Sequence, residues 1–103
     1  MASDQSIVDY ICGQLGDAGE ISSRKMFGEY GVYCGGKFFG VIYRNTLFVK
    51  KTKAGGALAA ELELAAPYPS AKPSFVIPEE KLEYSDWLTR FITATCDELP
   101  NKK

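Results

Sequence analysis

The stretch from Arg24 to Lys51 most constrains the fold, because strand-like runs follow one another there with turn-forming residues between them. Gly35-Gly36 joins two of these runs, and Asn45 lies in the joint between two others. Glycine and asparagine readily adopt the positive φ values that two-residue hairpin turns require. The pattern predicts an antiparallel meander. Its strands are expected near residues 21–27, 30–34, 37–43 and 46–51.

Helices are predicted on both sides of this meander. Before it, apolar residues recur about one helical turn apart between Ser3 and Gly16, with Ser3 as the N-cap and Gly16 as the stop. After it, an apolar stripe with a period of 3.6 residues predicts a last helix capped by Ser85 or Asp86. The stripe consists of Trp87, Leu88, Phe91, Ile92, Thr95 and Leu99.

The segment between the meander and the last helix is more irregular. A run of strong helix formers, AGGALAAELELAA, predicts a short helix that follows Gly55-Gly56. Clustered prolines predict a loop over residues 66–73. A short strand is expected at Ser74 to Ile77, and Pro78 should occupy the first position of a helical turn that continues with two glutamates.

Length and hydropathy predict one domain, residues 1–103, that does not enter a membrane. A chain of 103 residues is about the size of a single domain. Its longest apolar run, Phe38 to Tyr43, falls far short of the roughly 20 residues that cross a bilayer. The start of the chain carries acidic residues in place of the basic and apolar regions of a signal peptide, so a cytoplasmic location is expected.

Charge and side-chain chemistry favour a protein without catalysis. Twelve Lys and Arg against thirteen Asp and Glu give a net charge of -1, which supplies no general attraction for phosphate backbones. No histidine is present, so the usual general base near neutral pH is lacking. Cys12, Cys34 and Cys96 are widely spaced without a CxxC pair, which indicates packed thiols. No cofactor or metal ion is expected.

Two surfaces are candidates for binding. About three helices in so short a chain can cover one face of a twisted sheet but hardly both, so aromatic residues on the other face would form a patch for self-association or for a partner. The alternative is that the sheet coils enough to bury them. The aromatic residues expected there are Tyr33, Phe39, Tyr43 and Phe48.

The second surface is basic. Arg24-Lys25 and the lysines at 50, 51 and 53 form two clusters that neighbouring strands could bring together, although a solvated sheet edge is the default reading of such lysines. Residues 37–43 also partly match the RNP1 strand of RNA-recognition motifs, through Lys37, Phe39 and Gly40, but only one stacking ring remains.

One family resemblance covers nearly the whole chain. The segment RKMFGEYGVYCGGKFFGVIYRNTLFVK, residues 24–50, is similar to the N-terminal domain family of TfoX/Sxy, the regulators of competence-specific genes. The likeness continues more loosely through Ile77-Pro78-Glu79-Glu80 to the helix that contains Trp87. From this family, only fold-defining positions transfer. They are Arg24, Met26, Phe27, Gly28, Gly31 and Tyr33.

The resemblance implies a two-layer α+β fold similar to secretion-chaperone-like domains. A curved antiparallel sheet would carry the N- and C-terminal helices on one face. The resemblance also implies a two-strand hairpin around residues 66–75, but that segment is shorter and richer in proline here, so one strand is expected to be missing or irregular. Full-length members resemble transcriptional coactivators that work with a cyclic-AMP-responsive activator and carry a second, helical C-terminal domain. The 103 residues are expected to form the N-terminal domain alone.

Three functional hypotheses follow. The first is a non-enzymatic regulatory or adaptor domain that contacts a protein of the transcription machinery, a regulator, or a second copy of itself. The second is nucleic-acid binding through the basic sheet edge, and the third is a small enzyme of unknown reaction. The candidate interaction surface consists of Arg24, Lys25, Glu29, Tyr30, Tyr33 and Arg44.

Overall fold

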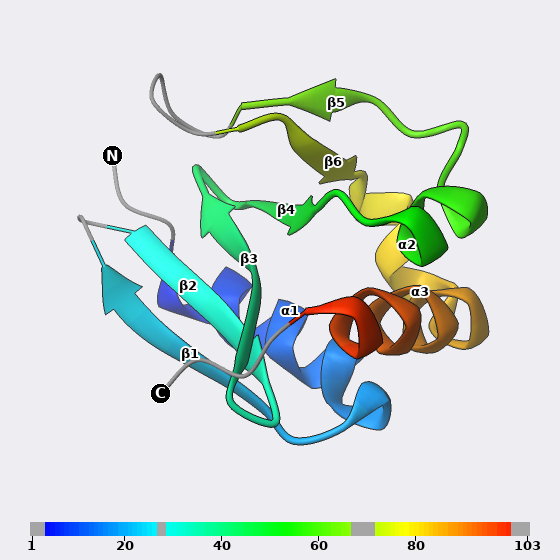
Figure 1. The fold of residues 1–103 in the computed structure, drawn as a ribbon. Coiled ribbons are helices and arrows are strands. Elements are labelled where there is room, and N and C mark those ends of the chain that lie inside the picture. Colours follow the sequence, from blue (N-terminus) through cyan, green and yellow to red (C-terminus); the bar gives the residue numbers. More distant parts are fainter. Residues whose placement is uncertain (1–3, 27–28, 67–71, 100–103) are drawn as a thin grey trace.

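The computed structural model describes residues 4–26, 29–66 and 72–99, which form an α+β fold (Figure 1). The helices are α1 (Gln5–Leu15), the 3-10 turn η1 (Gly16–Ala18), α2 (Lys53–Leu58), the 3-10 turn η2 (Glu79–Glu83) and α3 (Ser85–Glu98). The strands are β1 (Ile21–Met26), β2 (Glu29–Cys34), β3 (Lys37–Tyr43), β4 (Thr46–Lys50), β5 (Leu64–Ala65) and β6 (Ser74–Ile77). No helix within the described ranges is long and apolar enough to cross a membrane.

The strands form one antiparallel sheet in the order β1-β2-β3-β4-β6-β5. The predicted meander is confirmed as β1 to β4, and the predicted strand at Ser74–Ile77 is confirmed as β6. The sequence did not predict β5, a two-residue strand that pairs with β6 at the sheet edge. Most of the predicted 66–73 loop, residues 67–71, lies outside the described residues.

Both predicted hairpin turns have the expected backbone. Gly35 and Gly36 have φ values of 58° and 85°, and Arg44 and Asn45 have φ values of 51° and 64°. Two consecutive positive φ values give the turn a twist that matches the flanking strands. These turns fix the register of the three central strands.

A bulge in β3 reverses the expected orientation of its aromatic residues. Val32 pairs with Gly40, but Tyr33 pairs with Phe38, so Phe39 is an extra residue without a partner in β2. The side chain of Phe39 therefore points into the core, where it is 0% exposed, and Phe38 points to the opposite face. The prediction that Phe39 belongs to an uncovered aromatic face is therefore wrong.

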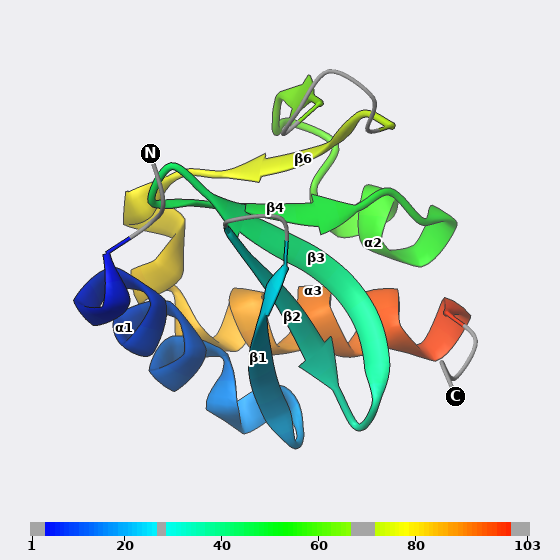
Figure 2. The same cartoon turned by 90° about the vertical axis from the view of Figure 1, so that its left-hand side faces the viewer.

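Helices α1 and α3 lie on the same side of the sheet, as expected (Figures 1 and 2). The core between them and the strands is apolar, and it includes most of the stripe predicted for the last helix. Its largest fully buried side chains are Phe39, Phe91, Ile11, Leu15, Ile42, Leu47, Ile77, Leu88 and Ile92. One face of the sheet is thereby covered.

The helix ends differ from the predictions. Ser3 lies outside the described residues, and Asp4 occupies the N-cap of α1 without a side-chain cap. Gly16 ends α1 as predicted, although the chain continues directly into η1. Tyr84 is the N-cap of α3 in place of the predicted Ser85 or Asp86, because η2 ends at Glu83 and leads straight into that helix. Pro78 is the N-cap of η2 and lies one position before its predicted place.

The short middle helix also starts earlier than predicted. α2 contains Gly55 and Gly56 instead of following them, and it ends at Leu58. Thr52 caps it by accepting a 3.0 Å hydrogen bond from the N–H of Gly55. Gly55 packs so closely on α3 that an added Cβ would lie 2.5 Å from Oγ1 of Thr95. Close helix packing therefore selects the glycine here.

Candidate interaction surface on the sheet

The outer face is defined here as the side of strands β1 to β4 that points away from α1 and α3 (Figure 2). Strand alternation and the bulge at Phe39 decide which residues belong to it. Its aromatic residues are Tyr33, Phe38, Tyr43 and Phe48, and each of them is half-buried. Its basic residues are Arg24 in β1, Lys50 in β4 and Arg44 in the turn between β3 and β4.

A basic side chain lies over three of these four rings. The guanidinium of Arg24 lies 5.8 Å from the centre of the Tyr33 ring, and the ammonium of Lys50 lies 4.5 Å from that of Phe38. The two rings are neighbours, with centroids 5.3 Å apart. At such distances the ring electrons attract the cation, by about 0.5–1 kcal/mol at an exposed site.

A third pair lies at the β3–β4 turn, where the guanidinium of Arg44 is 5.6 Å from the centre of the Tyr43 ring. The backbone N–H of Arg44 donates a 2.9 Å hydrogen bond to the Glu29 carboxylate. Glu29 is 7% exposed and holds the turn against β2. It is the one acidic residue in strands β1 to β4.

The six residues predicted for an interaction surface divide between the two sides of the sheet. Arg24, Tyr33 and Arg44 lie together on the outer face, whereas Glu29 is buried beside the turn at Arg44. Tyr30 belongs to the core side, because it is 7% exposed and its hydroxyl lies 3.1 Å from Oε1 of Gln5. Tyr30 must therefore be removed from the candidate surface. Lys25 pairs with Tyr30 and shares its side, so it is also removed.

Sequence reasoning missed Phe38 and Lys50 as a contacting pair. The two basic clusters do not meet at neighbouring strands, since β2 and β3 separate β1 from β4. They lie instead at the two ends of a row across the sheet. The hairpin register after Gly35-Gly36 could have paired Tyr33 with Phe38, but only the bulge reveals that Phe38 faces outward.

The bulge also changes the comparison with RNA-recognition motifs. Phe39, which fitted the RNP1 pattern, is fully buried in the core. Lys37 turns to the same side, where its ammonium donates a 2.9 Å hydrogen bond to the carbonyl of Cys96. Neither side chain is available to a base. The RNP1 match therefore does not describe a binding strand in this fold.

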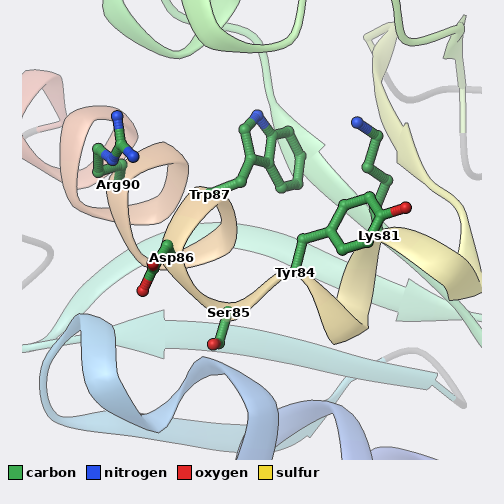
Figure 3. Close-up of a pocket in the computed structure, with 6 residues that line it drawn as sticks. All are labelled: Lys81, Tyr84, Ser85, Asp86, Trp87 and Arg90. Atoms are coloured by element: carbon green, nitrogen blue, oxygen red, sulfur yellow. The ribbon is translucent and has the colours of Figure 1, made fainter.

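A shallow hollow of about 390 Å³ lies at the start of α3 (Figure 3). Its polar groups diverge, because Ser85 and Asp86 point away from the ring of Trp87. Lys81 lies 5.0 Å from the centre of that ring and forms a 2.8 Å ion pair with Glu61. The remaining lining residues are Tyr84 and Arg90. Apart from this ion pair, whose Glu61 does not line the hollow, the lining residues do not bring an acid and a base to one point.

A second hollow, of about 340 Å³, lies between α1 and the strands β4 and β6. Apolar side chains such as Ile7 and Val76 line it, and Tyr10 at its rim is 42% exposed. Among the residues that the structure describes, no group of histidine, cysteine or acidic side chains could hold a metal ion.

The cysteines lie inside the fold as free thiols. Cys12 and Cys34 are half-buried, and Cys96 is buried. Burial, together with the neighbouring Cys34, raises the pKa of Cys96 to about 12. Burial also raises the pKa of Cys12. Because a thiol must lose its proton to act as a nucleophile, these two groups are poorly reactive at neutral pH.

The fold and its outer face define a small α+β domain in which helices cover one side of the sheet. The chain belongs to the TfoX N-terminal domain family, which matches residues 13–99. It is also similar to a protein of Spirochaeta aurantia described as an uncharacterized 12.7 kDa protein in the trpE 5' region. The two are 33% identical over 91 residues, which cover 85% of this chain and 79% of the relative.

Proposed function

We propose that this chain is a non-catalytic regulatory or adaptor domain that binds a protein partner through the outer face. The observation that carries the proposal is the cluster of four half-buried rings with three basic side chains beside them. Aromatic residues and arginine are the types enriched at protein interfaces, whereas lone exposed apolar residues need no explanation.

Family membership supports a role in regulation. The TfoX/Sxy resemblance implies contact with transcription machinery, and the proposed setting is the cytoplasm. An acid–base pair would support an enzyme instead, but the ionisable groups around the hollow of Figure 3 point in different directions. The buried thiols, with their raised pKa values, are also poor nucleophiles.

Nucleic-acid binding is the second candidate, because the outer face combines aromatic residues with basic ones. Single-stranded nucleic acids bind to proteins that combine aromatic rings with basic side chains. The net charge of -1 argues against it, because it provides no long-range attraction for phosphates. A protein partner is therefore the first choice.

Site-specific photocrosslinking in cells tests the proposal. A photoreactive phenylalanine analogue at Phe48 reports on the outer face, and the same analogue at Tyr84 is the matched control on the helical side. We expect discrete protein adducts from position 48 that are absent from position 84. Adducts to nucleic acid at position 48 would support the second candidate. Equal labelling from both positions, or no adduct at all, would contradict the proposal.

A further inference from the structure

We infer that the outer face binds an acidic segment of the partner, in which carboxylates flank apolar side chains. The inference rests on the proposed function and names the chemistry of the partner. It is carried by the order of the residues across the sheet, by the separation of charge between the two sides of the sheet, and by the exposure of the two arginines.

Four residues from four neighbouring strands form a row across the outer face. Arg24 of β1 lies over the ring of Tyr33 in β2, that ring contacts Phe38 in β3, and Lys50 of β4 lies over Phe38. The row thus has a cation at each end and two rings between them. Three strand spacings separate the ends, about 14 Å. An extended peptide covers that distance in about four residues.

Acidic residues are distributed unevenly between the strands and the helices. Strands β1 to β4 contain Glu29 as their single acid, and its carboxylate is buried and bonded to the N–H of Arg44. The elements beyond β4 carry many acids. These include Glu79, Glu80 and Glu83 in η2 and Asp86, Asp97 and Glu98 in α3. Although the net charge of the whole chain is -1, the outer face is therefore basic, and the helices on the other side of the sheet form an acidic helical layer.

The two arginines of the outer face, Arg24 and Arg44, are exposed. Among the described residues, neither Arg24 nor Arg44 forms an ion pair with a carboxylate, and both are exposed. Their positions over Tyr33 and Tyr43 restrain the two guanidinium groups before a partner arrives. Restraint of this kind lowers the entropy cost of binding.

The same geometry favours a polypeptide over a single-stranded nucleic acid. A base needs the free face of a ring, yet cations already lie over the rings of Tyr33, Phe38 and Tyr43. A carboxylate can approach the exposed guanidinium groups of Arg24 and Arg44 while they stay over their rings. Apolar side chains of the segment would meet Phe48, a half-buried ring of the same face.

The test uses a fluorescein-labelled peptide that has two glutamates four positions apart with leucine and valine between them. Its control is the same peptide with glutamines, and a labelled oligothymidine represents nucleic acid. Binding is measured by fluorescence polarisation at about 0.05 M and about 0.5 M salt. The variants are Arg24→Gln with Lys50→Gln, and the matched control is Arg90→Gln on the helical layer.

We expect the glutamate peptide to bind more tightly than the glutamine peptide and to lose affinity in high salt. Two ion pairs at the protein surface change affinity by about threefold to tenfold, so the double variant should lose that factor and Arg90→Gln should not. Thermal unfolding checks that each variant is folded. A charge exchange gives a further readout. Arg24→Glu with Lys50→Glu should prefer a lysine version of the peptide.

Each contrary result has a definite meaning. Equal binding of the glutamate and glutamine peptides would overturn the acidic-segment inference, while photocrosslinks at position 48 would leave the proposed function standing. Tighter binding of oligothymidine than of either peptide would overturn the inference in favour of a nucleic acid. A further outcome is that sedimentation of the wild type reveals self-association that the double variant abolishes. That result would mean that the outer face binds the acidic helices of another copy, and it would also overturn the inference.

Discussion

The Glu98 carboxylate accepts a 3.2 Å hydrogen bond from the backbone N–H of Lys53, so the end of α3 caps the start of α2. The same carboxylate also accepts a hydrogen bond from the N–H of Ala54. α2 has six residues, and a helix that short is not stable alone in water. In addition to Thr52, the helix is therefore capped by a residue 45 positions further along the chain.

Replacing this cap should weaken the fold measurably. Glu98→Ala leaves two N–H groups at the start of α2 without their acceptor, and the loss of a helix N-cap costs about 1 kcal/mol. Urea unfolding followed by circular dichroism measures the change. Asp97→Ala is the matched control, since Asp97 is also exposed at the end of α3 but Glu98 accepts both capping bonds. Equal losses in the two variants would show that the capping bonds contribute nothing.

Two glycine substitutions should have opposite effects. At Gly40, an added Cβ would lie 2.2 Å from the carbonyl oxygen of Phe48, so the backbone of β3 or β4 must move. Overpacking of this kind costs about 1–3 kcal/mol, and we expect Gly40→Ala to destabilise the protein by that amount. At Gly13, no atom lies within 4 Å of the added Cβ, and the residue is an exposed interior position of α1.

The variant Gly13→Ala should therefore stabilise the protein by about 1 kcal/mol, the difference between the two helix propensities. Denaturant unfolding of both variants in one experiment gives the comparison. Equal effects of the two substitutions would contradict the close approach of β3 to β4 at Gly40.

The bulge in β3 can be tested with neighbouring phenylalanines. Phe39→Ala removes a fully buried ring and should cost about 3–5 kcal/mol. Phe38→Ala removes a half-buried ring on the outer face and should cost about 1 kcal/mol. Regular alternation without a bulge would place Phe38 with Gly40 and Ile42 in the core. The reverse order of the two losses would thus exclude the bulge.

The stability should depend on Cys96 at alkaline pH. Its ordinary pKa is 9.0, and burial together with the neighbouring Cys34 raises the pKa in the folded protein to about 12. The unfolded chain therefore loses this proton first, and folding becomes less favourable as the pH rises between these values. Below pH 9 the contribution of the thiol is fully present.

The measurement compares wild type with Cys96→Ala, because other groups also titrate in this range. The stability advantage of the wild type should be constant up to about pH 8 and shrink at about pH 10.5. An advantage that stays the same at both pH values would rule out a raised pKa for this thiol.

The amino-acid sequence alone determined the local features of this protein. The turn residues Gly35-Gly36 and Asn45 predict the hairpins, and the apolar period predicts α1 and α3, because such signals depend on neighbours in the chain. They also suffice for the predicted meander. The small number of helices predicts one covered face, and the family resemblance adds the two-layer α+β class.

Only the tertiary structure decided which side chains face the outer side of the sheet. The extra residue at Phe39 reverses the alternation, which moves Phe38 outward and Phe39 into the core, and no local pattern signals it. The start of α2 likewise depends on Glu98, and the row from Arg24 to Lys50 depends on the order of four strands. Contacts between distant residues set these features, and short-range periodicity does not contain them.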